Sequence, residues 1–240
     1  MPQPLLSRTY DALSLIARGH PRTVLRRVFG TRMRSETLAL GLRRDLTVPH
    51  PIPAAKIALD VRPLRRGDDL SLLDIEASGL PSDVVFARLA QRRLLAEGLP
   101  TCWVAIGPDQ KVCYMQWLLG PRDNASIQAQ WGDLFPPLAP DEALLEGAYT
   151  GDAYRGQGIM GHAMSRIALA ALDLGARWVN TFVGQGNIAS LKGCKRAGFS
   201  PYLRRAETWR LLRRRVRVAR LPEGTPYPFD LPTHGIGANL

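Results

Sequence analysis

The sequence lacks several features that would assign it to particular classes of protein. Its three cysteines, Cys102, Cys113 and Cys194, are an odd number, include no CxxC pair and are not accompanied by paired histidines. This argues against a disulfide framework and against a zinc site, so no bound metal is expected. No apolar run approaches the roughly 18 residues that a membrane-spanning helix needs. The first twenty residues show no basic leader and no small-residue cleavage site, so we expect no signal peptide and predict a cytoplasmic location.

Acidic residues are scarce at both flanks of the chain. The sequence carries 32 lysines and arginines against 21 acidic residues, a net charge of +11. Residues 1–50 hold nine arginines against three carboxylates, and residues 204–220 hold eight arginines against Glu207. Nucleic acid is disfavoured as a partner because no reader motif accompanies the charge, whereas an acidic carrier protein and peripheral contact with anionic lipid stay open. The alternation over residues 213–218 also fits an edge strand whose arginines face water.

The composition, with 45% hydrophobic and 22% charged residues, is that of a globular protein with one domain of ordinary size. We predict three parts: a basic helical N-terminal extension over residues 1–52, a main domain over 53–221 and a C-terminal tail over 222–240. Two short amphipathic patterns, over residues 6–17 and 25–29, predict two helices in the extension. Prolines crowd residues 49–63 and mark its boundary.

The main domain alternates between strand and helix patterns. Strands are predicted over residues 57–64, 101–106, 111–119, 143–150 and 178–183, with closing strands from residue 199. Helices are predicted over 68–77, 82–96, 157–174 and 188–197, the third ending at Gly175. The fold class is therefore mixed α/β (α+β), with one βαβ crossover among antiparallel neighbours. The connection over residues 121–141 is long enough to form a lid over an acceptor, or an extra hairpin packed on the sheet.

A glycine-rich turn joins the strand over residues 143–150 to the following helix. Gly156, Gly158 and Gly161 lie in this turn, where glycine lets the backbone come close to a ligand. The first N–H groups of a helix have no partners within it, so they can point at an anion, and Arg155 adds a positive charge beside them. The turn therefore predicts a phosphate site. It is not a GxxxxGK[ST] loop.

Two motifs together resemble the GNAT superfamily of acyl-CoA-dependent N-acyltransferases. Residues 155–159, RGQGI, match the R/Q-x-x-G-x-G/A loop of that family, and residues 183–199 resemble its strand, Asn-x-x-Ala/Ser, helix and terminal Gly-Phe. The resemblance covers about residues 57–212. It implies the GNAT fold, in which helices flank a mixed, mostly antiparallel central sheet, here with the N-terminal helical extension added.

The resemblance also implies which residues hold coenzyme A, and it implies no metal. The loop amides would hold the pyrophosphate, and the strand entering the loop would pair with pantetheine, with an asparagine and a serine beside it. On this sequence the loop residues are Arg155, Gly156, Gln157, Gly158, Ile159, Met160 and Gly161, the strand residues Ala148, Tyr149 and Thr150, and the last two Asn187 and Ser190. Two positions depart from the family pattern. Met160 stands where a small residue is usual, and Cys194 where many members have a tyrosine that protonates the leaving thiolate.

Acyl transfer to an amine needs a base for the amine and a proton for the departing thiolate. Glu146 is our first candidate for the base and Glu142 the second, since their even spacing puts them on one strand face. Either can instead be a solvated carboxylate. Cys194 can serve as the acid or pack as an inert core thiol. Tyr149, Tyr154, Tyr202 or water could replace the acid.

The resemblance implies an N-acyltransferase, and most simply an N-acetyltransferase. Acetyl-CoA or another acyl-CoA would be the co-substrate, and a small-molecule primary amine would attack it directly in a ternary complex. Two alternatives stay open: a non-catalytic module that binds acyl-CoA for regulation, and an acyltransferase whose donor is an acyl carrier protein. A homodimer is compatible with either.

Overall fold

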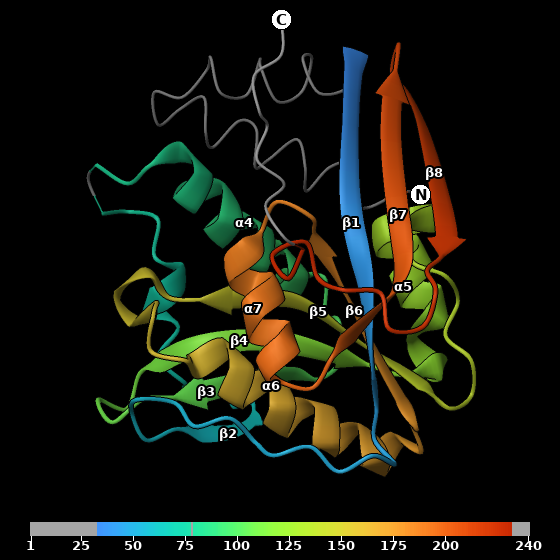
Figure 1. Cartoon of the computed structure of the whole chain (residues 1–240). Helices are drawn as coiled ribbons and strands as arrows, with labels where there is room; N and C mark the ends of the chain where they lie inside the picture. The colour runs from blue at the N-terminus through green and yellow to red at the C-terminus, as the bar shows by residue number, and fades with distance from the viewer. Residues whose placement is uncertain (1–32, 78, 232–240) are drawn as a thin grey trace, which may run out of the picture.

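The computed structural model describes residues 33–77 and 79–231 (Figure 1). In this part of the chain an eight-stranded sheet carries four α-helices. The strands are β1 (Arg34–Asp45), β2 (Asp60–Pro63), β3 (Cys102–Ile106), β4 (Val112–Leu119), β5 (Glu142–Thr150), β6 (Trp178–Gly184), β7 (Ser200–Arg210) and β8 (Arg213–Arg220). The helices are α4 (Ser82–Ala96), α5 (Asn124–Trp131), α6 (Ile159–Ala170) and α7 (Ile188–Arg196).

The sheet is mixed and mostly antiparallel, as predicted. Its order is β2-β3-β4-β5-β6-β1-β7-β8, and among these strands only β5 and β6 run parallel, joined by the crossover helix α6. Their pairing covers Glu142–Leu144 against Trp178–Asn180, after which the two strands diverge. Figure 1 shows β2 to β4 lying across the view while β1, β7 and β8 stand upright, so the sheet twists strongly along its width.

Strand β1 corrects the predicted N-terminal boundary. It lies within the range that we assigned to a helical extension, yet it pairs with β6 on one side and with β7 on the other. Leu38, Leu40 and Leu42 alternate with the period of a strand, and Leu40 and Leu42 pack into the core beneath α6 and α7, while β6 and β7 supply the backbone partners. The two predicted helices lie outside the described residues. The three-part division otherwise stays a prediction, although Tyr227 of the predicted tail is buried and donates a hydrogen bond to the Phe199 carbonyl at 2.7 Å.

Two other predictions differ from the structure. The helix expected over residues 68–77 is reduced to one 3-10 turn, Ser71–Leu73. The Asp69 and Asp74 carboxylates accept hydrogen bonds from the Ser71 and Glu76 N–H groups at 2.8 and 2.9 Å, so local turns compete with the helix. The connection over residues 121–141 contains helix α5 rather than an extra hairpin. The remaining elements fall within a few residues of their predicted bounds, and Gly175 ends the α6 segment with φ +76°.

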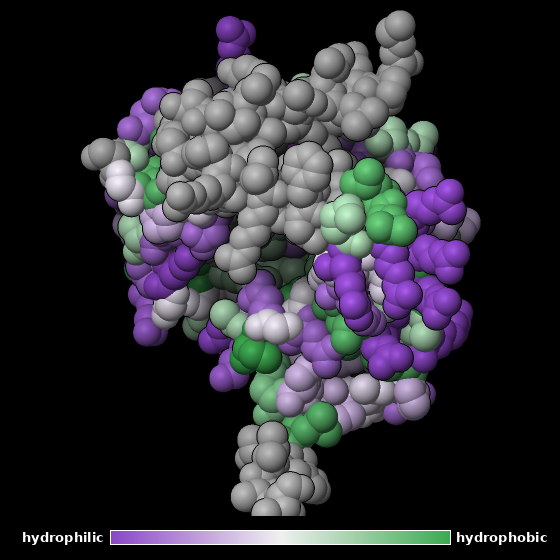
Figure 2. All heavy atoms as spheres, turned by 90° about the horizontal axis from the view of Figure 1, so that it is seen from above, coloured by the Kyte–Doolittle hydropathy of each residue, from purple (hydrophilic) through white to green (hydrophobic). Residues whose placement is uncertain are grey.

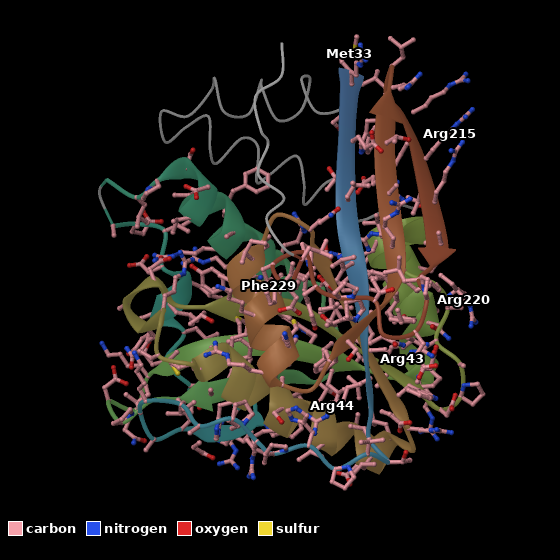
Figure 3. The ribbon with its side chains drawn as sticks, viewed as in Figure 1. Met33, Arg43, Arg44, Arg215, Arg220 and Phe229 are labelled. Carbon is pink, nitrogen blue, oxygen red and sulfur yellow. The ribbon has the colours of Figure 1, made fainter. Side chains whose placement is uncertain are left out.

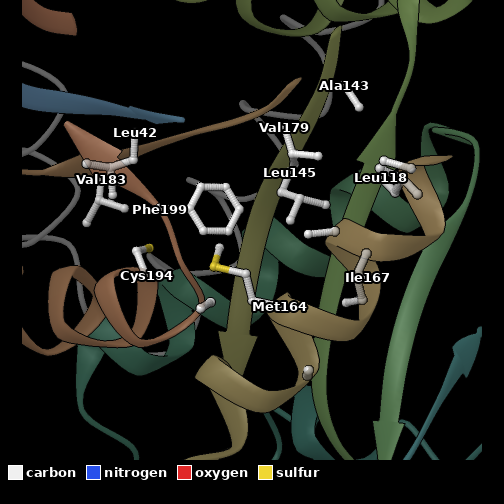
Figure 4. Close-up of a cluster of buried hydrophobic side chains, with 14 of the residues drawn as sticks. Leu42, Leu118, Ala143, Leu145, Met164, Ile167, Val179, Val183, Cys194 and Phe199 are labelled. Carbon is white, nitrogen blue, oxygen red and sulfur yellow. The ribbon is translucent and has the colours of Figure 1, made fainter. Parts of the chain in front are cut away.

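The sheet buries a hydrophobic core on each face. Helices α6 and α7 lie in front of it in Figure 1, and Figure 4 shows Leu42, Met164 and Phe199 packed between these helices and the strands. The other face packs against α4 and α5 through Leu94 and Ile127. The three cysteines are buried with free thiols.

Arg44 ties β1 to the helical layer. Its guanidinium is 3% exposed and donates from Nη1 to the Ser165 hydroxyl on α6 and to the Ala197 carbonyl after α7, both at 2.9 Å. Burial lowers the pKa of Arg44. The strand that we predicted to lie outside the domain is thus bonded to both helices that border the glycine loop.

Leu42→Ala tests whether β1 is part of the folded domain. Leu42 is fully buried, so the substitution should lower the free energy of unfolding by about 2–5 kcal/mol in urea titrations of the full chain. Leu172→Ala is the matched control, because Leu172 is 52% exposed and its truncation should cost no more than about 0.5 kcal/mol. Equal stabilities for the two variants would contradict the placement of β1.

Candidate functional site

Strand β5 carries a bulge where it leaves its parallel partner. Glu146 pairs with Trp117 of β4 and Tyr149 pairs with Met115, so β5 has one residue more than β4 over this interval. Gly147 takes up the bulge with φ +69°, and a Cβ there would lie 2.8 Å from the Trp117 ring. Only glycine fits that position without a shift of the tryptophan. The bulge re-aims the residues that follow, so Ala148 is exposed while Tyr149 is buried.

The glycine turn leads directly into helix α6. Gly158 is the N-cap of α6 with φ +77°, and it has no side chain to satisfy the first N–H groups of the helix. The N–H groups of Ile159, Met160 and Gly161 therefore face outward, ready to donate to an anion. Gly156 also has a positive φ, and no atom lies within 4 Å of the position that its Cβ would occupy. The turn forms an open concavity lined by backbone.

Helix α7 forms the facing wall. The Asn187 side chain caps it by accepting from the Ser190 N–H at 3.2 Å. Helices α6 and α7 approach closely here, since a Cβ on Gly193 would lie 3.0 Å from the Met160 sulfur. The side of α7 that faces the glycine turn repeats every three or four residues, at Ala189, Gly193 and Arg196.

These elements enclose a groove of about 550 Å³, which we call the loop groove. It contains all the residues predicted to bind coenzyme A except Gln157 and Gly161. The Gln157 carbonyl is instead bonded to the Lys56 N–H at 2.9 Å, and the position of a Gly161 Cβ faces Pro53 and the Gly193 carbonyl. Sequence reasoning missed six lining residues, namely Tyr114, Tyr154, Ala189, Lys192, Gly193 and Arg196. The helical spacing from Ala189 to Arg196 was the available signal for four of them.

The proline-rich stretch supports the glycine turn from below. A Cβ on Gly158 would lie 3.2 Å from the Ala54 carbonyl, and His162 of α6 donates from its ring to the Pro53 carbonyl at 3.0 Å. The Lys56 N–H also donates to the Gln157 carbonyl. The segment from Pro53 to Lys56 therefore contacts the turn and the start of α6 at three places. Residues that we interpreted as a domain boundary therefore support the site.

The loop groove is positively charged. Arg155, Lys192 and Arg196 line it, and no carboxylate does. Arg155 is more than half exposed, and one of its nitrogens lies 2.8 Å from Asp152, just outside the groove. The remaining charge favours an anionic ligand.

A buried arginine holds the residues at the start of the turn. Arg88 of α4 donates to the Tyr149 hydroxyl at 3.2 Å and to Asp152 at 2.7 Å, and it also donates to the Asp74 carbonyl. Tyr149 is 6% exposed. The end of β5 is thereby fixed to the helix on the opposite side of the sheet.

Glu146 lies on β5 immediately before the bulge and is partly buried beside Trp117. Burial raises the pKa of its carboxyl from 4.5 to about 7, and the Gly147 N–H and the Arg205 guanidinium limit the rise. Arg205 lies 5.2 Å above the Phe135 ring and 5.0 Å above the Phe182 ring, and it donates to the Leu134 carbonyl at 2.8 Å. The carboxyl therefore changes its protonation state near neutral pH.

The Glu142 carboxylate makes structural contacts instead. Its carboxylate forms an ion pair with Arg43 and accepts from the Ala139 N–H at 3.0 Å. It lies at the opposite end of β5 from the loop groove, in a second groove of about 470 Å³ that we call the strand-end groove. Phe135, Pro136, Leu138 and Ala139 of the long connection line that groove, as do Arg220 and Tyr202. Glu146 lies between these two grooves along the strand but lines neither of them, and we do not carry Glu142 forward as the proposed base.

Cys194 belongs to the core and not to either groove. It is 0% exposed, and Figure 4 shows it beside Phe199 and Val183. Burial raises the pKa of its thiol to about 12, and it lines neither groove. The inert role is the one that the structure supports.

The alternative tyrosines are divided between the two grooves. Tyr154 lines the loop groove but donates its hydroxyl to Asp109, which raises the pKa of Tyr154 to about 12. Tyr202 lines the strand-end groove, where burial raises its pKa to about 12. Tyr149 also lines the loop groove, where its hydroxyl accepts from Arg88 at 3.2 Å. The raised pKa values make Tyr154 and Tyr202 poor proton donors at neutral pH.

Within residues 33–77 and 79–231, no group of three or more His, Cys, Asp or Glu side chains is arranged to hold a metal ion. The same part of the chain contains no helix that is long and apolar enough to cross a bilayer.

The chain has the GNAT fold, as the resemblance predicts. No family model and no curated protein matches the sequence. Among solved structures, the GCN5-related glucosamine N-acetyltransferase region of a fungal multi-domain GH3 β-N-acetylglucosaminidase matches with a TM-score of 0.50 and 12% identity, over 78% of this chain and 21% of that one.

Two bacterial structures match over more of this chain. A GCN5-related N-acetyltransferase from Sphaerobacter thermophilus matches with a TM-score of 0.45 and 13% identity, over 82% of this chain and 56% of that one. A GNAT-family acetyltransferase from Colwellia psychrerythraea matches with a TM-score of 0.41 and 13% identity, over 80% and 59%. The chain therefore spans less than two thirds of either protein.

The raised pKa of Glu146 predicts a pH-dependent stability. Between pH 4.5 and about 7 the folded chain holds a proton that the unfolded chain has released, so the free energy of unfolding falls as pH rises through this window. Glu146→Gln cannot titrate. At pH 8 it should be more stable than the native chain by no more than about 3 kcal/mol, and at pH 4 the two should be equal. Urea unfolding at both pH values measures this, and a difference that does not depend on pH would contradict it.

Proposed function

We propose that this protein is an acyl-CoA-dependent N-acyltransferase that transfers an acyl group, most simply acetyl, to a primary amine. One observation carries the proposal. The open backbone turn at the N-terminus of α6, the bulged end of β5 and the capped helix α7 enclose one cationic groove. That groove runs from the outward N–H groups of α6 to Ala148, Tyr149 and Thr150, the end of β5 that lies beyond its pairing with β6.

The groove suits the parts of coenzyme A in order. The outward N–H groups of Ile159, Met160 and Gly161 would hold the pyrophosphate, with Arg155, Lys192 and Arg196 opposing its charge. The exposed backbone at Ala148 would pair with the pantetheine arm, which lies against Asn187 and Ser190. Met160 fits the groove because Gly193 leaves room for its side chain. The same residues would also bind the phosphopantetheine arm of a carrier protein. What we propose of the donor is therefore that it carries its acyl group on a pantetheine arm.

Glu146 is the proposed base. It lies between the two grooves, and a pKa of about 7 suits the transfer of a proton from an ammonium group at neutral pH. The freed amine would form the C–N bond as the C–S bond of the thioester breaks. A bound acyl donor already has an activated carbonyl, so no covalent enzyme intermediate is needed.

The leaving thiolate would take its proton from water. A free thiol has a pKa of about 8.5, so the thiolate is a stable leaving group near neutral pH. No side-chain acid is needed, and the absence of Cys194 from both grooves is no obstacle.

The strand-end groove is the proposed acceptor site. It begins at Glu142 and Leu144, one strand repeat from Glu146, and the long connection forms one wall through Phe135 to Ala139. The predicted acceptor lid and this wall are the same segment. The raised pKa of Glu146 favours a catalyst over a module that only binds acyl-CoA. The cytoplasmic location stays a prediction.

Coenzyme A binding tests the loop groove first. Arg155→Glu places a carboxylate beside the pyrophosphate site, so the Kd for acetyl-CoA should rise at least about tenfold by isothermal titration calorimetry. Arg66→Glu makes the same charge change at an exposed residue outside the groove and should leave the Kd within about twofold. If the native chain shows no acetyl-CoA or acyl-CoA binding, the proposed function is wrong.

Turnover tests the base. With a panel of primary amines and thiol detection, kcat/KM should rise with pH around an apparent pKa of about 7 in the native chain. Glu146→Gln should lower kcat by roughly 100-fold or more and lose this limb of the pH profile, while acetyl-CoA binding is retained. Cys194→Ala should keep kcat within about threefold and lose stability instead, because it removes only a core side chain. The reverse pattern would return the catalytic role to Cys194.

A further inference from the structure

The turn between β7 and β8 exposes two leucines. Arg210 pairs with Arg213, so Leu211 and Leu212 form a two-residue turn, and these side chains are 73% and 60% exposed. Their φ angles are +47° and +65°, the signs found in type I′ turns. Such turns favour Asn-Gly, because positive φ is unfavourable for a bulky side chain. Leucine at both positions is therefore unfavourable twice over, because its backbone is strained and its apolar side chain is exposed to water.

A third apolar side chain lies beside this turn. Met33, at the upper end of β1 in Figure 3, is 48% exposed, and its carbonyl accepts from the Leu211 N–H at 3.1 Å. Met33, Leu211 and Leu212 therefore form one exposed cluster at the end of three adjacent strands, which we call the apolar tip. Its position at the end of the hairpin leaves it clear of both cores.

Arginines gather on one face of the strands that carry the apolar tip. The cross-strand register aligns Arg34, Arg210 and Arg213 in a single row across β1, β7 and β8. Alternate positions on the same face add three more exposed arginines, and we call the six residues the arginine face: Arg34, Arg204, Arg210, Arg213, Arg215 and Arg217. Figure 3 shows Arg215 pointing away from the sheet, and Figure 2 shows hydrophilic side chains gathered on the side where β7 and β8 lie.

The arginine face carries uncompensated charge. In the described part of the chain none of its six members has an ion-pair partner, and Glu36 is the one carboxylate that shares the face. On the opposite face of the same hairpin Arg214 is paired with Asp133, and Arg205 is bonded to the Leu134 carbonyl. Like charges directly opposite one another destabilise a sheet, so a row of three arginines indicates a surface that meets anions.

We propose that the β7–β8 hairpin docks the protein on an anionic membrane surface. The apolar tip would enter the boundary between headgroups and acyl chains, and the arginines nearest to it would contact lipid phosphates. An apolar cluster with arginines along one adjoining face matches a surface that is anionic outside and apolar just beneath. Nucleic acid would use the arginines, but it offers nothing to the leucines, and the arginine face carries no aromatic side chain for base stacking.

Vesicle co-sedimentation of the full chain tests the proposal. Vesicles of phosphatidylcholine with phosphatidylglycerol should bind the chain at low salt, and high salt should weaken the binding. Vesicles of phosphatidylcholine alone should bind it at least about tenfold less. No binding to the anionic vesicles, or equal binding to both kinds, overturns the proposal.

Variants separate the roles of the tip and the arginine face. Leu211→Asn with Leu212→Gly suits the positive φ angles, so the hairpin should fold at least as well while vesicle partitioning falls about tenfold or more. Leu172→Ser is the matched control, since that leucine is 52% exposed elsewhere, and its partitioning should not change.

Replacing Arg213, Arg215 and Arg217 by Gln should lower partitioning about fivefold per residue, whereas Arg66→Gln should not. If the variant with Leu211→Asn and Leu212→Gly still binds vesicles as the native chain does, the membrane proposal is wrong. It is also wrong if duplex DNA displaces the native chain and this variant from vesicles equally, because the surface then serves a polyanion.

Discussion

The short parallel pairing of β5 and β6 is the constraint on which the candidate site depends. Parallel strands that follow one another need a crossover, and α6 supplies it, so the chain must turn into that helix directly above the end of β5. Because pairing stops after Leu144 and Asn180, the strands separate and leave backbone groups of β5 unpaired on that side. The bulge at Gly147 then turns Ala148 outward. The anion site and the free strand edge therefore follow from one feature of topology.

Strand β1 stabilises that divergence from the other side. It covers the edge of β6 that faces away from β5, so β6 keeps a full antiparallel partner after its bonds to β5 have ended. Arg44 then links β1 to Ser165 of α6 and to the residue that follows α7. The two helices that enclose the loop groove are thus fixed to the sheet by an arginine from a strand more than one hundred residues earlier in the sequence.

Local patterns predicted the elements whose signals are local. The glycine turn, the helix after Asn187 and the strand periods over residues 101–119 and 143–150 have short-range causes, and the structure places these elements within a few residues of the prediction. The errors arise where distant partners decide. Leu38 to Leu42 is a strand because β6 and β7 flank it, and the Pro53 to Lys56 segment supports the glycine turn through contacts about one hundred residues apart. The helix expected near Asp69 failed for a local reason, the competition of aspartate side chains for backbone N–H groups.

The two candidate catalytic groups show why residue type alone could not decide between them. Burial raises the pKa of both Glu146 and Cys194 by between two and three units. For the carboxyl this moves the titration to neutral pH, where a base is useful, whereas for the thiol it moves the titration beyond any physiological range. Their positions differ as well, since Glu146 lies on β5 between the residues that line the two grooves and Cys194 lies on the buried side of α7 against Phe199. The same physical effect thus suits one group to the proposed proton transfer and makes the other inert.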